Sequence, residues 1–174
     1  MNRERPSPAR PGGTGATTAT PARAVIIGYG CRLRADDAIG PLAADALARV
    51  HLPDVEVHAV DRDGTVLLEL WEGRDLAIVI DAVRTAGAAT PPGTLHRWDG
   101  LALPPPASAV FPSSHAVGLR EAVALGATLG RLPRRLVIFA IEARTFEPAA
   151  APSPEVESAL GRIRALVLRE IDFA

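Results

Sequence analysis

Short apolar runs alternate with amphipathic segments along most of the chain. The apolar runs predict strands at residues 24–28, 55–60, 76–81, 93–98 and 136–141. Helical spacing of apolar residues predicts helices at 37–50, at 67–71 and from about 115 to 130, and Ser153-Pro154-Glu155 predicts the start of a C-terminal helix. Strands that alternate with helices are typical of an α/β fold with a mostly parallel sheet.

The strand at 76–81 differs from the others because its apolar run is continuous. It reads Leu-Ala-Ile-Val-Ile and then ends on Asp81. Such a run predicts a strand that is buried on both faces, in the middle of the sheet. The strand at 93–98 is expected nearer an edge, since a proline cluster at 104–106 follows it.

The first 22 residues differ in composition from the rest of the chain. They are mostly Pro, Gly, Thr, Ala and Arg, with almost no large apolar side chain. Such a segment buries too little surface to offset the entropy of ordering, so we expect a disordered tail at 1–22. Residues 23–174 are then expected to form a single α/β domain.

Charge and cysteine content narrow the function classes. The 174 residues carry 19 basic and 20 acidic side chains, so no positive excess favours a nucleic acid or an anionic membrane as partner. No apolar run approaches the roughly 20 residues that span a bilayer, and no signal-peptide core is evident. A single cysteine, Cys31, excludes an internal disulfide. We therefore expect a soluble cytoplasmic protein that acts on a protein or a small ligand.

Two acids follow the first strand, at the predicted start of the first helix. One of them, Asp36, can cap the helix, which leaves Asp37 without a structural role. Ligands of open α/β sheets bind beyond the carboxyl ends of the strands, and Asp81 ends the central strand there. Asp37 and Asp81 are therefore expected to share one crevice.

The third candidate is a histidine. Of the four histidines, only His115 is predicted to open a helix at a loop boundary, directly after two serines. Its position alone is equally compatible with a surface histidine. Two carboxylates and one imidazole would suit a divalent metal with open positions, or acid–base chemistry on a water molecule.

Two alternatives involve the same turn. Gly28-Tyr-Gly30 between a strand and a helix resembles a dinucleotide-binding turn, but Leu33 stands where the third glycine belongs, and acids at the helix start would repel a phosphate. Alternatively, Cys31 could be a nucleophile with His115 as its base. A buried, unreactive thiol would also fit the apolar neighbours of Cys31.

Taken in order, these motifs resemble those of the hydrogenase maturation endopeptidases, which trim the C-terminal extension of the large subunit of nickel–iron hydrogenases. The matching residues follow the family pattern at suitable spacing over roughly residues 24–171: Gly28, Gly30, Leu33, Asp36, Asp37, Gly40, Asp81-Ala82, Pro92-Gly93-Thr94, Ser113-Ser114-His115 and Leu119. Two positions differ from the family, since Cys31 replaces an asparagine and Asp37 replaces what is commonly a glutamate.

The resemblance implies a fold, a site and a partner. The fold would be a three-layer α/β/α sandwich around a mostly parallel, five-stranded twisted sheet. The site would be formed by Asp37, Asp81 and His115, which would contact nickel held by the hydrogenase large-subunit precursor, so no permanently bound cofactor is expected. The precursor would be the partner of a monomeric endopeptidase.

Overall fold

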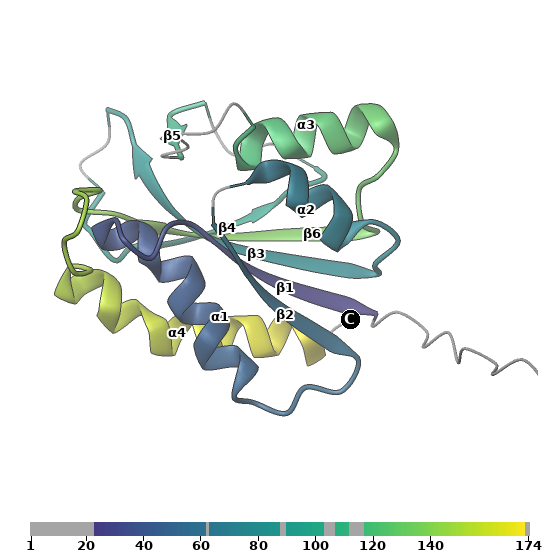
Figure 1. The fold of residues 1–174 in the computed structure, drawn as a ribbon, viewed down its shortest axis with the longest axis horizontal. Coiled ribbons are helices and arrows are strands. Elements are labelled where there is room, and N and C mark those ends of the chain that lie inside the picture. Colours follow the sequence, from purple (N-terminus) through teal and green to yellow (C-terminus); the bar gives the residue numbers. More distant parts are fainter. Residues whose placement is uncertain (1–22, 62, 88–89, 103–106, 112–116, 173–174) are drawn as a thin grey trace, which may run out of the picture.

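A central sheet with helices on both faces forms the body of the protein (Figure 1). The computed structural model describes residues 23–61, 63–87, 90–102, 107–111 and 117–172. The α/β/α sandwich expected from the sequence is confirmed. Within these ranges, no helix is both long enough and apolar enough to span a membrane.

The strands lie close to their predicted positions. They are β1 (Ala24–Tyr29), β2 (Val55–Val60), β3 (Leu76–Thr85), β4 (Leu95–Asp99), β5 (Ala109–Val110) and β6 (Arg135–Glu142). The sheet has the order β2-β1-β3-β6-β4, in which β2, β1, β3 and β6 are parallel and β4 pairs antiparallel with β6 at one edge. The predicted central place of β3 and edge place of β4 are both confirmed.

The helices divide between the two faces of the sheet. They are the 3-10 helix η1 (Ala35–Ala38) and the α-helices α1 (Ile39–Ala48), α2 (Gly64–Trp71), α3 (Leu119–Leu129) and α4 (Pro154–Asp172). Figure 1 shows α1 and α4 on one face, and α2 and α3 on the other. A separate apolar cluster lies under each pair, which explains why both faces of β1, β3 and β6 are apolar.

Two helix starts differ from the sequence-based prediction. The third helix was expected from about residue 115, but α3 begins at Leu119 with Gly118 as its N-cap. The second helix begins earlier than residue 67, since the Asp63 carboxylate accepts a hydrogen bond from the backbone N–H of Thr65 at 2.9 Å and caps α2.

The central strand is longer than predicted. β3 continues past Asp81 to Thr85, because Arg84 and Thr85 pair antiparallel with the short strand β5. Asp81 therefore lies within the strand and not at its end. It is still near the carboxyl end of the parallel sheet, and β1 no longer pairs with β3 beyond Ile80.

A pair of glycines brings α1 directly against β1. A Cβ atom on Gly28 would lie 2.1 Å from the carbonyl oxygen of Gly40, and a Cβ on Gly40 would lie 2.2 Å from the carbonyl oxygen of Tyr29. Neither contact is possible with a side chain. The close approach fixes the start of α1, and η1 before it, over the carboxyl ends of β1 and β3.

Candidate active site

Two buried carboxylates meet where η1 passes over the end of β3. Asp37, in η1, is 1% exposed, and Asp81, in β3, is 2% exposed. Burial raises the pKa of the Asp81 carboxyl well above its ordinary value, and repulsion from the Asp37 carboxylate raises it further. The two acids that were expected to lie together at the strand ends are therefore close enough to repel each other.

The turn before η1 places Asp37. Gly30 has a φ of +135°, and its backbone N–H donates to the carbonyl oxygen of Val60 at 3.1 Å. A Cβ atom at Gly30 would lie 2.1 Å from the backbone oxygen of Asp37 and 3.2 Å from its Oδ1. The glycine is thus required for the backbone of Asp37 to approach β1, which accounts for it without a bound phosphate.

One oxygen of Asp81 is satisfied within the protein and the other is not. Its Oδ1 accepts a hydrogen bond from the backbone N–H of Ala82 at 2.7 Å. Its Oδ2 is buried and accepts no hydrogen bond within the ranges that the structure describes. A buried carboxylate oxygen of this kind is costly unless it carries a proton or meets a cation. The pair is therefore chemically suited to hold a proton or to contact a divalent metal.

The role expected for Asp36 is wrong. Neither η1 nor α1 has a side-chain cap, and the fully buried Asp36 carboxylate turns instead to the loop between β6 and α4. It accepts hydrogen bonds from the backbone N–H groups of Arg144 at 2.7 Å, Thr145 at 3.1 Å and Ser153 at 2.6 Å. A side-chain cap is not needed, because the first backbone N–H groups of η1 donate to carbonyl oxygens of the same loop, Ala35 to Ala150 at 3.0 Å and Asp36 to Thr145 at 3.3 Å.

Further backbone contacts join the same two segments. Ala35 N–H donates to the carbonyl oxygen of Ala150 at 3.0 Å, and Ala149 N–H donates to that of Leu33 at 2.7 Å. Together with Asp36, these bonds hold η1 rigidly against the 143–153 loop. Asp36 was expected to cap its own helix. It instead binds a loop more than 100 residues further along the chain and so helps to position its neighbour, Asp37.

The remaining predicted residues are placed only in part. His115, and the two serines before it, lie outside the described residues, so the third member of the predicted set is not located. Within the described ranges, no three His, Cys, Asp or Glu side chains are grouped so as to hold a metal ion.

Cys31 lies on the wall of a cavity of about 310 Å³ beside the site. Its thiol is buried, with 7% of the residue exposed. The other lining residues come from the glycine turn, the start of α1 and the end of β2: Gly30, Arg32, Leu33, Pro41, Ala59, Val60 and Asp61. The cavity adjoins Asp37 through Gly30, which touches both.

One buried acid near this end of the sheet was not anticipated from the sequence. Glu142, the last residue of β6, is 4% exposed, and its carboxylate accepts hydrogen bonds from the backbone N–H of Thr85 at 2.7 Å and from its hydroxyl at 2.8 Å. His96 Nε2 lies 3.2 Å from the same carboxylate. Glu142 follows an apolar run in the sequence, as Asp81 does, and this pattern could have identified it as a candidate.

Comparison with known proteins agrees with the fold and identifies the family. Residues 43–170 match the family model of the hydrogenase maturation protease HycI. The chain belongs to the hydrogenase maturation protease family. The resemblance inferred from the turn, the Asp81-Ala82 pair and the later motifs is thereby confirmed.

Two relatives with similar sequences are named as hydrogenase formation or maturation proteins. The hydrogenase expression/formation protein HupD of Thiocapsa roseopersicina is 31% identical over 120 residues, which cover 68% of this chain and 53% of that protein. This chain thus matches about half the length of that relative. The hydrogenase 2 maturation protease of Escherichia coli K12 is 30% identical over 141 residues, or 78% of this chain and 82% of that protein.

A solved structure shows the same fold. The hydrogenase maturating endopeptidase HybD from E. coli superposes with a TM-score of 0.69 at 24% identity, over 86% of this chain and 92% of that chain. The family's α/β/α architecture is therefore that of this protein.

Proposed function

We propose that this protein is an endopeptidase that matures a nickel–iron hydrogenase by removing the C-terminal extension of its large-subunit precursor after nickel insertion. The observation that carries the proposal is the buried pair of Asp37 and Asp81, one of which keeps an unbonded, buried oxygen. Membership of the maturation protease family supports the substrate class.

In this proposal the nickel belongs to the substrate. Asp37, Asp81 and His115 contact nickel that the precursor already holds, so the protein needs no permanently bound cofactor. Without the precursor, the raised pKa of Asp81 favours its protonated form. A divalent cation at the pair reverses this preference, since it favours the ionised carboxylate and displaces the proton.

Hydrolysis then requires a base and an oriented peptide bond. An ionised carboxylate of the pair accepts a proton from the attacking water, and the proton passes to the leaving amine as the peptide C–N bond breaks. The buried position of the pair limits solvent, and contact with the nickel holds the scissile bond in register. Both steps require fixed positions for the two acids, and the surrounding backbone provides them.

The alternative mechanism, in which Cys31 is the nucleophile, requires a different role for this residue. It requires Cys31 to attack the peptide bond, whereas the acid pair requires only that Cys31 fill space beside Gly30. Cys31→Ala separates the two, because alanine keeps the buried apolar contact and removes the nucleophile.

The test uses nickel-loaded large-subunit precursor and detects the released C-terminal peptide by mass spectrometry. We expect Asp37→Asn to lower the cleavage rate by about 100-fold or more, the range associated with a lost acid–base group. Cys31→Ala and the control Glu157→Gln, which alters an exposed acid on α4, should cleave at the wild-type rate. Full activity of Asp37→Asn, or loss of activity in Cys31→Ala, would overturn the proposal.

A further inference from the structure

The outer edge of β2 presents free strand positions beside the candidate active site. Among the residues that the structure describes, β2 is the last strand at its side of the sheet and pairs with β1 alone. The carbonyl oxygen of Val60 faces β1, since it accepts the hydrogen bond from Gly30 N–H. Backbone groups of successive strand residues point to opposite sides, so the N–H and C=O groups of Ala59 and Val57 point away from the sheet.

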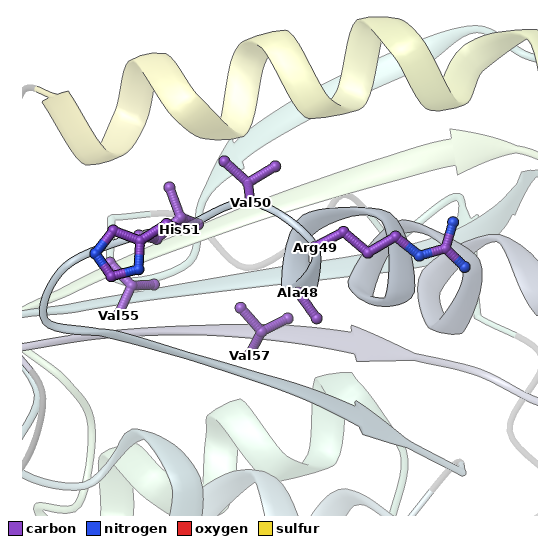
Figure 2. Close-up of a pocket in the computed structure, with 7 residues that line it drawn as sticks. Ala48, Arg49, Val50, His51, Val55 and Val57 are labelled. Atoms are coloured by element: carbon purple, nitrogen blue, oxygen red, sulfur yellow. The ribbon is translucent and has the colours of Figure 1, made fainter.

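A cavity lies at each end of this edge, on the α1 side of β2. The first is the cavity of about 310 Å³ at Cys31, which Ala59 and Pro41 also line. The second, of about 480 Å³, lies at the last turn of α1 and the start of β2. Figure 2 shows Val57 of β2 projecting toward Ala48 there, with His51 above Val55.

Helix α1 lines the space between the two cavities. Pro41 and Arg49 line one cavity each, and Asp45 lies between them at helical spacing. Asp45 forms a two-pronged ion pair with Arg32, at 2.6 and 2.8 Å, which neutralises both charges beside the edge. At the active-site end, the Leu33 side chain is 73% exposed, an unusual position for a large apolar residue.

We propose that the C-terminal extension of the precursor binds along this edge as an added strand, paired with Ala59 and Val57. The inference rests on the proposed function and adds the path of the substrate. The first cavity adjoins both Asp37, through Gly30, and the exposed edge at Ala59, so a peptide bond at the acids continues naturally onto β2. Alternate side chains of an added strand point toward α1 and enter the two cavities.

The extension suits this edge better than the precursor's other parts. Residues before the scissile bond belong to the body that holds the nickel, whereas the extension is a chain terminus that can become extended at low cost. In the tail of this chain, Pro6, Pro8 and Pro11 cannot donate hydrogen bonds to a neighbouring strand, whereas residues 12–20 contain no proline, so the tail is one rival. Pairing of β2 between two copies of this chain is the remaining rival.

Ala59→Pro tests the pairing. Proline removes the outward N–H at position 59 and leaves the ladder between β2 and β1 intact, a placement that edge strands accept. We expect the KM for nickel-loaded precursor to rise by about fivefold or more, the effect of one lost backbone hydrogen bond, with kcat unchanged. The matched control, Ala59→Ser, keeps the N–H and should raise the KM much less than Ala59→Pro does.

The outcomes separate this inference from the proposed function. If the wild type does not cleave the precursor, the proposed function fails; if the wild type and Ala59→Pro cleave with equal KM, only the edge pairing fails. Amide hydrogen exchange of Asp37→Asn, in which slow cleavage lets the full-length precursor persist, provides a second test that leaves the β2 edge unchanged. The amides of Ala59 and Val57 should be protected in the presence of full-length nickel-loaded precursor and exchange freely with precursor lacking its extension.

The rivals give different exchange patterns. Protection of these amides in the protein alone, lost on dilution, would assign the edge to a second copy and overturn the inference. Protection that is lost when residues 1–22 are deleted would assign it to the tail, with the same consequence.

Discussion

The carboxylate of Asp37, in a 3-10 turn, repels that of Asp81, in the central strand, and so adds to the burial that raises the pKa of Asp81. The glycines at 28, 30 and 40 impose this repulsion, because they allow the turn to approach the strand ends closely. Bringing two like charges together does not favour folding, yet three glycines make this approach possible. The arrangement therefore indicates a functional role for the two acids.

The first prediction concerns stability against pH. Because the pKa of Asp81 is raised in the folded protein, the folded state binds more protons than the unfolded state above the ordinary value of 3.8. The free energy of unfolding therefore falls as the pH rises from about 4 toward the raised pKa. Asp81→Asn removes this loss, so its Tm should exceed that of the wild type by a margin that grows with pH.

Thermal unfolding from pH 4 to pH 8 measures this margin. The control Asp45→Asn should behave in the opposite way, since the hydrogen bond from Arg32 lowers the pKa of Asp45. Its small effect should be a loss of stability near neutral pH. A margin for Asp81→Asn that shrinks with rising pH would contradict the ionisation behaviour assigned to the pair.

The second prediction concerns Asp36. Asp36→Asn replaces one carboxylate oxygen by an amide N–H₂ group, which opposes the backbone N–H groups of the 143–153 loop. We expect a loss of about 2–3 kcal/mol in the free energy of unfolding, the scale of hydrogen bonds to a buried charge. Asp45→Asn, which breaks an exposed ion pair, should cost less than about 1 kcal/mol. Urea denaturation compares them, and equal costs would contradict the role given to Asp36.

The third prediction concerns the contact between α1 and β1. The Cβ of Gly40→Ala would lie 2.2 and 2.5 Å from the carbonyl oxygens of Tyr29 and Ile80, and backbone cannot yield as a side chain does. We expect a loss of about 3 kcal/mol or more, or failure to fold. Gly161→Ala, in an open position of α4, should instead gain up to about 1 kcal/mol from helix propensity. Normal stability of Gly40→Ala would refute the packing argument.

Periodicity was sufficient to predict most of the fold. Strand β2 has the predicted limits, and the continuous apolar run of β3 correctly indicated a strand covered on both faces. The extension of β3 to Thr85 was missed because its partner β5 is too short to leave a pattern in the sequence. The late start of α3 was missed because serines that resemble caps precede the true N-cap, Gly118.

The closeness of Asp37 and Asp81 was predictable, because it depends on strands that can be recognised in the sequence. Asp37 follows β1, and Asp81 lies near the carboxyl end of β3, which runs parallel to β1, so their proximity could be inferred from the sequence alone. The partner of Asp36 could not, since it is a loop 108 to 117 residues further along the chain. Glu142 was missed for a similar reason, because its burial depends on Thr85 of a neighbouring strand.

We propose that the acid pair belongs to a protease that recognises nickel in its substrate. The most direct test mixes the wild-type protein with two samples of the same large-subunit precursor, one loaded with nickel and one free of it, and follows release of the C-terminal peptide by mass spectrometry. Only the nickel-loaded precursor should be cut. Equal cleavage of both samples would contradict nickel recognition, and cleavage of neither would contradict the protease assignment itself.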